Sequence, residues 1–198
     1  SDGASNQNVY TRQYSYGEFI ESDVSGNAAN SSDLSANSSA SGNQASFHNA
    51  GGALVTRTEQ ENSSRIRSNA IVTSFDYGGV YSNASGVGNA VSVGNNDVYV
   101  EIDNSQLNSG GVEVAASFEG TNGYDSYVTA DAVGNSITGY ACSTCEGIIN
   151  ATNHQGNSGN VTATANTTIR GASRAVITST TATGNAATFY VARPGTSQ

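Results

Sequence analysis

The stretch that decides the fold is Gly88-Asn89-Ala90-Val91-Ser92-Val93, followed by Gly94-Asn95-Asn96-Asp97 and then by Val98-Tyr99-Val100-Glu101-Ile102-Asp103. Small or branched apolar residues alternate with polar residues on both sides of a short segment of Gly, Asn and Asp. Alternation with a period of two, bounded by such residues, is typical of two β-strands joined by a turn. The stretch therefore predicts a strand, a tight turn and a second strand.

The Gly-Asn pair that opens this stretch recurs along the chain. The pairs that carry the repeat are Gly42-Asn43, Gly88-Asn89, Gly134-Asn135, Gly159-Asn160 and Gly184-Asn185; Gly26-Asn27 precedes them, and the pairs at Gly94 and Gly156 are out of register. Gly111 divides the interval between the second and third pairs into two equal halves. Two strands and two turns in about 22–25 residues form one rung of a β-solenoid, so the sequence predicts an all-β β-solenoid of such rungs. A β-sandwich is the alternative, because it also has short, regularly spaced strands.

Each Gly-Asn pair has an expected role in stacking these rungs. Rungs about 4.8 Å apart hydrogen-bond to the rungs above and below through their backbones. An Asn at the same place in successive rungs can form an amide ladder. The glycine before it is expected to provide a corner with positive φ, which other residues resist. The five pairs are therefore the predicted repeat corners and ladder residues.

The two ends of the chain depart from the repeat. We expect an N-terminal strand or arm over residues 1–25, the solenoid over 26–191 and a C-terminal tail over 192–198. The arm alternates, and a strand of this kind can complete the open edge of a neighbouring copy by β-augmentation. The predicted assembly residues are Val9, Tyr10, Tyr14, Tyr16 and Phe19.

Composition excludes several classes of protein. The 198 residues carry a formal net charge of −9, and only 12% of them are charged. The basic residues are seven scattered arginines, whereas phosphate binding needs clustered cations, so nucleic acid is not an expected partner. No apolar stretch approaches the ~18 residues of a membrane helix. The polar start, Ser1-Asp2-Gly3, is expected for a processed, secreted chain.

Few residues offer catalytic or metal chemistry. His48 and His154 have no acid or nucleophile at a motif spacing, so the protein is not expected to be an enzyme. Carboxylates such as Glu101 and Asp103 would be the acid and base if it were. Cys142 and Cys145 lack the partners of a zinc or redox site, and a local disulfide is the prediction. No cofactor is expected; calcium at Asn- and Asp-rich turns is the alternative.

The repeats resemble curlin-type repeats. Gly86-Val87-Gly88-Asn89-Ala90-Val91-Ser92-Val93 and Gln155-Gly156-Asn157-Ser158-Gly159-Asn160-Val161 carry this resemblance best. The chain also resembles the holdfast-anchor surface proteins of stalked bacteria, which are secreted adhesin components. It departs from curlins in lacking regular Gln at the strand ends, in its Cys pair and in its irregular rungs. The resemblance implies an extracellular or cell-surface protein that acts in adhesion.

These observations together predict a structural subunit of a secreted, pilus-like surface fibre in adhesion or a biofilm matrix. The subunit would assemble with itself as a homopolymer, by strand stacking or by donation of the N-terminal strand, and surface polysaccharide is a second expected partner. The alternative is a monomeric binding module, either a glycan adhesin or an ice-binding protein. Threonine-rich segments such as Thr162-Ala163-Thr164 favour the ice-binding form of this alternative.

Overall fold

A computed structural model describes residues 6–142 and 147–191. The described residues form strands and no helix. The strands are β1 (Gln7–Ser15), β2 (Phe19–Asn49), β3 (Leu54–Asn62), β4 (Arg65–Asn95), β5 (Tyr99–Asn108), β6 (Val112–Ala141), β7 (Ile148–Asn157), β8 (Val161–Arg170) and β9 (Ala175–Val191). Every strand pairing is parallel. The prediction of an all-β solenoid is confirmed, and parallel pairing excludes the alternative of an antiparallel sandwich.

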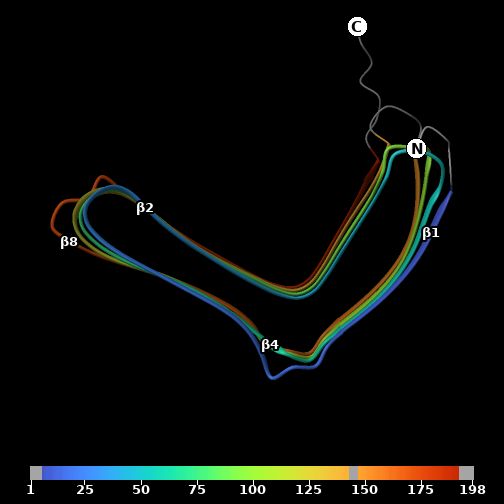
Figure 1. Cartoon of the computed structure of the whole chain (residues 1–198), viewed down its shortest axis with the longest axis horizontal. Helices are drawn as coiled ribbons and strands as arrows, with labels where there is room; N and C mark the ends of the chain where they lie inside the picture. Colours follow the sequence, from blue (N-terminus) through green and yellow to red (C-terminus); the bar gives the residue numbers. More distant parts are fainter. Residues whose placement is uncertain (1–5, 143–146, 192–198) are drawn as a thin grey trace, which may run out of the picture.

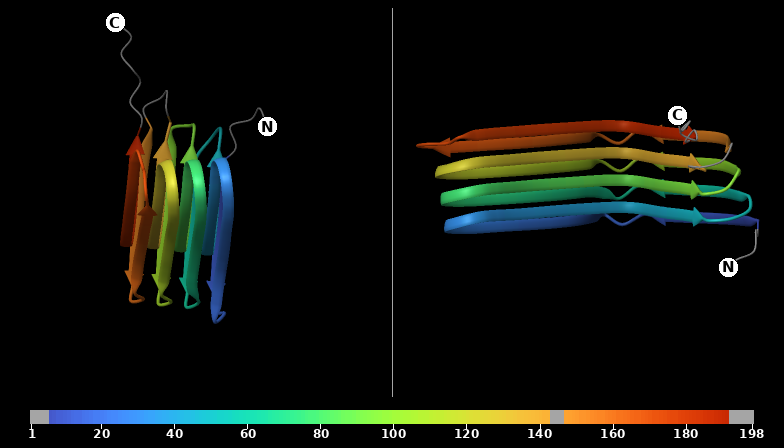
Figure 2. Two further views of the ribbon diagram at one scale, coloured as in Figure 1. Left: turned by 90° about the vertical axis from the view of Figure 1, so that its left-hand side faces the viewer. Right: turned by 90° about the horizontal axis from the view of Figure 1, so that it is seen from above.

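The chain winds into four rungs, which lie one above another (Figure 2). The short strands form a sheet in the order β1-β3-β5-β7, and the long strands form a second sheet in the order β2-β4-β6-β8, with β9 also paired to β6. The first rung is β1 and β2, the second is β3 and β4, the third is β5 and β6, and the fourth is β7, β8 and β9. Each rung therefore pairs only with its neighbours in the stack.

The predicted rung of 22–25 residues is wrong, because one rung takes twice that length. Asn43 meets Asn89, and Asn89 meets Asn135, at a separation of 46 residues. A strand, a turn and a second strand make only half a rung, since the chain must travel out along one layer and back along the other. The last rung is longer, with a separation of 50 residues between Asn135 and Asn185.

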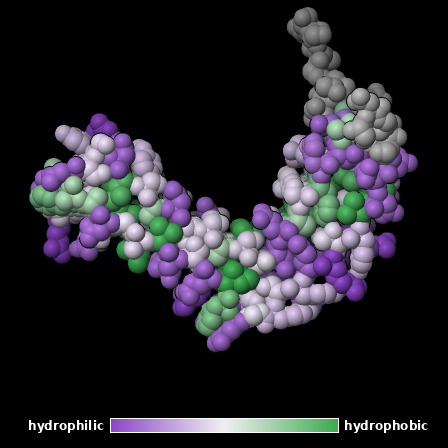
Figure 3. All heavy atoms as spheres, viewed as in Figure 1, coloured by the Kyte–Doolittle hydropathy of each residue, from purple (hydrophilic) through white to green (hydrophobic). Residues whose placement is uncertain are grey.

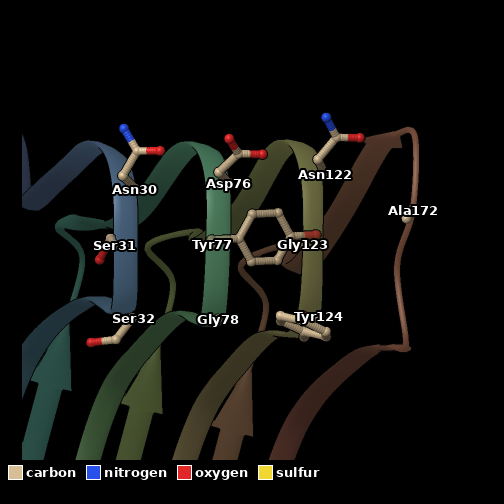
Figure 4. Close-up of a pocket in the computed structure, with 10 residues that line it drawn as sticks. All are labelled: Asn30, Ser31, Ser32, Asp76, Tyr77, Gly78, Asn122, Gly123, Tyr124 and Ala172. Atoms are coloured by element: carbon tan, nitrogen blue, oxygen red, sulfur yellow. The ribbon is translucent and has the colours of Figure 1, made fainter.

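Each rung is bent into a V with two layers in each arm (Figure 1). We call the outer half the convex layer (residues 7–29, 54–75, 99–121 and 148–170) and the inner half the concave layer (31–49, 77–95, 123–141 and 175–191). The chain changes layer at the tip of one arm, where Asn30, Asp76 and Asn122 lie side by side at the same place in three successive rungs, with φ of 55°, 50° and 52° (Figure 4). Asn and Asp tolerate this left-handed conformation better than most residues. Gly171, with φ of 84°, follows in the fourth rung.

Each arm encloses its own narrow apolar core. The arm formed by the long strands buries residues such as Ile66, Val80 and Phe118. The other arm buries a second cluster that includes Leu54 and Ile102. Figure 3 looks onto one end of the stack and shows apolar residues between hydrophilic rims. Small and branched side chains suffice because the two layers lie close together, as the composition predicts.

Tyr77 is a buried aromatic side chain in the turn region at the tip of the arm. Its ring lies edge-on to Phe118, with 5.1 Å between the ring centroids. Figure 4 shows the ring reaching across toward Gly123 of the next rung, where an added Cβ would overlap it. Edge-to-face pairs of this kind add to the free energy of burial. Gly123 is therefore required by the space that Tyr77 fills.

Candidate functional site

A buried ladder of asparagines lies at the bend of the concave layer. The side-chain amide of Asn43 donates to Oδ1 of Asn89 at 2.8 Å, and Asn89 donates to Asn135 at 2.8 Å. Asn135 donates in turn to Asn185 at 2.7 Å. The second N–H of each amide donates across the core to a carbonyl of the convex layer, as Asn89 does to Leu107 at 2.9 Å. The ladder therefore joins the rungs and also fixes the separation of the layers.

Gly159 and Asn160 do not belong to this ladder, although the sequence places them in it. They lie at the turn between β7 and β8, where the Asn160 carbonyl accepts from the N–H of Val112 at 2.8 Å. Gly159 lies against the backbone of Gly110 in the rung below. Because the rung is 46 residues long, a Gly-Asn pair 25 residues after Asn135 falls in the opposite layer.

The glycines that precede the ladder asparagines are required because there is no space for a side chain, and not because they have positive φ. The prediction of a positive-φ corner at these glycines was therefore wrong. Among the described glycines, only Gly52 and Gly171 have positive φ. A Cβ on Gly88 would lie 2.5 Å from the carbonyl oxygen of Gly134. Gly42 and Gly134 face the next rung in the same way. The backbones of successive rungs meet too closely at this corner for any side chain.

A second ladder, which the sequence analysis missed, consists of glutamines in the convex layer. The side-chain amide of Gln60 donates to Gln13 at 2.7 Å, Gln106 donates to Gln60 at 2.9 Å, and Gln155 donates to Gln106 at 2.7 Å. The second N–H of Gln106 donates to the Ser136 carbonyl in the concave layer at 2.9 Å. The expectation that the chain lacks regular Gln was therefore wrong. The signal was present as Gln at separations of 47, 46 and 49 residues.

A third ladder occupies the corner of the convex layer. The amide of Asn62 donates to Asn108 at 2.7 Å, and Asn108 donates to Asn157 at 2.7 Å. The first rung has Ser15 at this place, and Oδ1 of Asn62 is buried with no hydrogen-bond partner among the described residues. This ladder therefore begins one rung later than the other two.

The predicted arm of residues 1–25 is part of the first rung wherever it is described. β1, which contains Val9, pairs with β3 of the same chain. The hydroxyl of Tyr14 donates to Glu59 at 3.1 Å, and the hydroxyl of Tyr16 donates to Glu61 at 3.1 Å. Tyr10 donates to Glu59 and Phe19 lies beneath the guanidinium groups of two arginines. These side chains cover the convex surface of their own chain instead of projecting from it.

Glu59 is the centre of this polar cluster. Arg12 lies 2.8 Å from its carboxylate. The hydrogen bond from Arg12, with those from Tyr14 and Tyr10, holds the pKa of Glu59 below its ordinary value. Both charged groups are exposed, so the pair orders the surface more than it stabilises the fold.

The two end rungs are open within residues 6–142 and 147–191. In this part of the chain, β1 and β2 have neighbours on one side only, and so do β7, β8 and β9. Core residues of the inner rungs such as Ile66 and Val112 are 0% exposed. Their counterparts at the ends, Ile20 and Val161, are only partly buried, and Val176 is 50% exposed. The ends therefore leave apolar surface and one backbone edge without a partner.

Aromatic residues form two columns on the outer surface of the concave layer. Tyr81 and Tyr127 stack with 5.1 Å between centroids and an interplanar angle of 5° on one arm. On the other arm Tyr140 stacks on Tyr190 at 5.9 Å, and its hydroxyl lies 2.8 Å from Nδ1 of His48. The polar side chains between the columns include a ladder of Asn37, Asn83 and Thr129. The inner side of the V thus combines aromatic rings with hydroxyl and amide groups.

The other residues that the sequence singled out are placed as follows. Glu101 accepts from the Tyr99 hydroxyl at 2.9 Å, and Asp103 pairs with Arg57 at 3.0 Å. Thr162 and Thr164 lie in register with Glu113 and Ala115, so they form no threonine column. Cys142 is buried and disulfide-bonded, while Cys145, its predicted partner, lies outside the described residues.

Two further features of the described residues concern metal binding and membrane insertion. The described residues contain no group of three or more His, Cys, Asp or Glu that could hold a metal ion. They contain no helix that is long and apolar enough to cross a membrane. The predictions about calcium and enzyme activity stay predictions.

Comparison with known proteins supports the second of the two resemblances. The model of a family described as holdfast attachment protein D matches residues 1–111, more than half of the chain. No curated protein and no solved structure gives a match. The matched segment contains the first two rungs and most of the convex layer of the third, with Asn43, Asn89 and the first three glutamines of the second ladder. The resemblance to curlins stays a prediction, whereas the chain belongs to the holdfast attachment protein D family.

Proposed function

We propose that the protein is a structural subunit of a cell-surface fibre and that it assembles by stacking its end rungs on those of other copies. The family gives the chain a role in adhesion at the cell surface. The observation that carries the finer proposal is the pair of open ends. Within the described residues no helix or loop covers the outer edge of β1 and β2 or of β7, β8 and β9.

The open ends carry unpaired backbone groups and partly exposed apolar side chains, which contact with another copy would pair and bury. Natural proteins usually protect exposed edge strands with charges, proline, bulges or a covering element. The single proline of this chain, Pro194, lies outside the described residues. Stacking would pair the free backbone groups of a whole rung and bury the partly exposed Ile20, Val161 and Val176. The added backbone hydrogen bonds and the burial of apolar side chains both favour association.

Electron microscopy and sedimentation of the purified protein test the assembly. We expect filaments whose population grows with protein concentration. Thr180 is exposed and points between the layers at the open end of the fourth rung, so Thr180→Lys should abolish filaments, because stacking would bury an unpaired ammonium group. Thr168→Lys, on the outer surface of β8 in the same rung, should leave them intact. Monomers at every concentration would refute the proposal.

A second proposed function is binding of surface polysaccharide in the concave face. The tyrosine columns on the two arms, with amide and hydroxyl groups between them, support it, because amphipathic rings suit the apolar and hydroxyl surfaces of sugars. A glycan array should show binding that Tyr127→Ala weakens. Tyr124→Ala, at the tip of the arm and 61% exposed, should not weaken it. Equal binding by the native protein and Tyr127→Ala would contradict this function.

A further inference from the structure

The two long amide ladders donate in opposite directions along the stack. In the asparagine ladder each amide donates to the rung that follows, from Asn43 through to Asn185. In the glutamine ladder each amide donates to the rung before, from Gln155 back to Gln13. The cross-layer bond of each amide fixes which of its atoms faces which neighbouring rung. The stack therefore has a defined chemical direction.

This direction leaves complementary groups at the two ends. At the first rung, Oδ1 of Asn43 has no donor among the described residues, and Nε2 of Gln13 makes only one hydrogen bond, to the Gln44 carbonyl at 2.9 Å. At the last rung the situation is reversed. Nδ2 of Asn185 reaches only the Gln155 carbonyl, at 3.4 Å, and Oε1 of Gln155 has no donor among the described residues. Each end thus offers what the other end lacks.

The two end rungs also carry net charges of opposite sign. The first rung, residues 7–49, has one arginine and four carboxylates, which are Glu18, Glu21, Asp23 and Asp33. The fourth rung, residues 148–191, has two arginines, Arg170 and Arg174, and no carboxylate. Opposite net charges attract over roughly a Debye length, about 8 Å at physiological salt. The first rung of one copy is therefore suited to the last rung of another.

One arginine is placed to bridge such a contact. Arg174 donates to Asp125 of the third rung at 2.9 Å. Asp125 lies in a column with Gly79 and Asp33, and the next residue in this column is Ala175. A copy stacked in the same register would place its Asp33 beside Ala175 and next to Arg174. Arg67 already makes this arrangement within the chain, at 3.5 Å from both Glu21 and Glu113.

We infer that the copies stack in one direction only, with the last rung of each copy against the first rung of the next. In this arrangement Asn185 donates to the next copy's Asn43, and that copy's Gln13 donates to Gln155, so both ladders continue through the junction. Contact between two first rungs would join two ends that both lack a donor for Asn43 and both carry a spare donor at Gln13, and it would set four carboxylates against four. The resulting fibre is polar and its two ends differ.

The inference of one-way stacking rests on the proposed assembly. Two variants, each with one end rung blocked, distinguish a failure of the inference from a failure of the assembly. Thr11 points between the layers at the open side of the first rung, is partly buried and makes no side-chain hydrogen bond in the described structure. Thr11→Lys therefore blocks the first rung, as Thr180→Lys blocks the last. Circular dichroism checks that both variants fold, and size-exclusion chromatography with light scattering gives their masses. We expect each variant alone to be a monomer and the 1:1 mixture to form a dimer of twice the mass.

Each outcome decides between specific arrangements. Dimers of either variant alone, with no additional species in the mixture, would show that like ends associate and would overturn the inference while leaving assembly intact. Monomers in the mixture together with filaments of the native protein would also overturn it. Absence of filaments from the native protein would instead refute the proposed assembly itself.

Cross-linking gives a second measurement that does not depend on a charged side chain at the junction. Ser46 and Thr188 lie in the same exposed column of the concave layer, at the two ends of the stack. Rungs about 4.8 Å apart bring Cα atoms within the range of a disulfide. The double variant Ser46→Cys/Thr188→Cys should form covalent oligomers on oxidation, and Ser46→Cys alone should not. Efficient dimers of Ser46→Cys alone would contradict a one-way stack.

Discussion

Replacement of Asn89 by alanine tests whether the asparagine ladder holds the rungs together. Asn89 is 0% exposed and lies at the centre of the ladder. Its amide accepts from Asn43 and donates to Asn135 and to the Leu107 carbonyl, at 2.8, 2.8 and 2.9 Å. Asn89→Ala would leave one N–H and two oxygen atoms in the core without partners.

The expected loss follows from these three groups. A buried polar group without a partner costs about 1–3 kcal/mol. Partial entry of water would relieve part of this cost, so we expect Asn89→Ala to lower the free energy of unfolding by about 3–6 kcal/mol. Because whole domains are stable by only about 5–15 kcal/mol, the variant should unfold at a much lower urea concentration.

Asn83→Ala is the matched control. Asn83 lies in the same strand and also joins a ladder, in which it donates to Asn37 at 2.8 Å and accepts from Thr129 at 2.7 Å. These groups lie on the concave surface, where water replaces a lost partner. The expected loss is about 0.5–1 kcal/mol. Urea unfolding should be followed by circular dichroism at a concentration where the protein is monomeric. Equal losses for the two variants would refute the role assigned to the buried ladder.

Three further predictions concern packing and pH. Gly88→Ala should prevent folding or strongly lower the thermal midpoint, because its Cβ would meet the Gly134 carbonyl, whereas Gly111→Ala, with 3.5 Å to its nearest neighbour, should fold. Phe118→Ala should cost about 3–5 kcal/mol in urea unfolding, and a smaller loss than that of Asn83→Ala would contradict the core position of the ring. Hydrogen bonds from the Gly52 and Val98 N–H groups lower the pKa of Asp97 in the folded protein from its ordinary value of 3.8. The ionised Asp97 therefore stabilises the fold above pH 3.8, and this stabilisation is lost as the pH falls through the lowered pKa of the folded state. The difference in urea midpoint between the native protein and Asp97→Asn should shrink below about pH 4.

The sequence predicts the β-solenoid and one of its ladders because those features repeat with their neighbours. Asn43, Asn89 and Asn135 each follow a glycine at equal spacing, so the ladder can be recognised in the sequence as a recurring Gly-Asn dipeptide. The glutamine ladder repeats at similar spacing, but its flanking residues change completely. Gln13 lies between Arg12 and Tyr14, whereas Gln60 lies between two glutamates. Flanking residues point away from the core and are free to vary, so no motif marks this ladder.

The rung length could not be predicted from alternation because the decisive turn occurs inside continuous strands. β2, β4 and β6 pass from the convex to the concave layer within one continuous strand, and the residues around the turn differ between rungs, with Gly78 and Gly79 in β4, Gly123 in β6 and serines in β2. Single residues at positive φ, Asn30, Asp76 and Asn122, make this change. Their spacing of 46 residues is present in the sequence, yet the residue varies between Asn and Asp and its neighbours differ from rung to rung, so no repeated motif marks the turn until the register of the neighbouring rung is known.

The polar ladders at the bend and the open end rungs together have a consequence for adhesion. The ladders fix the V outline of each rung, so copies stacked in register would continue one concave groove along the fibre. Tyr81 and Tyr127 lie in register with Ser35 and Ile177, so each copy would add one pair of stacked tyrosines to that arm. One such pair gives a weak site, but sites repeated along a fibre bind a long polymer with an affinity raised by orders of magnitude through effective concentration. The proposed stacking and the proposed polysaccharide binding would therefore support each other, since a weak surface on a single copy would be sufficient once copies were aligned.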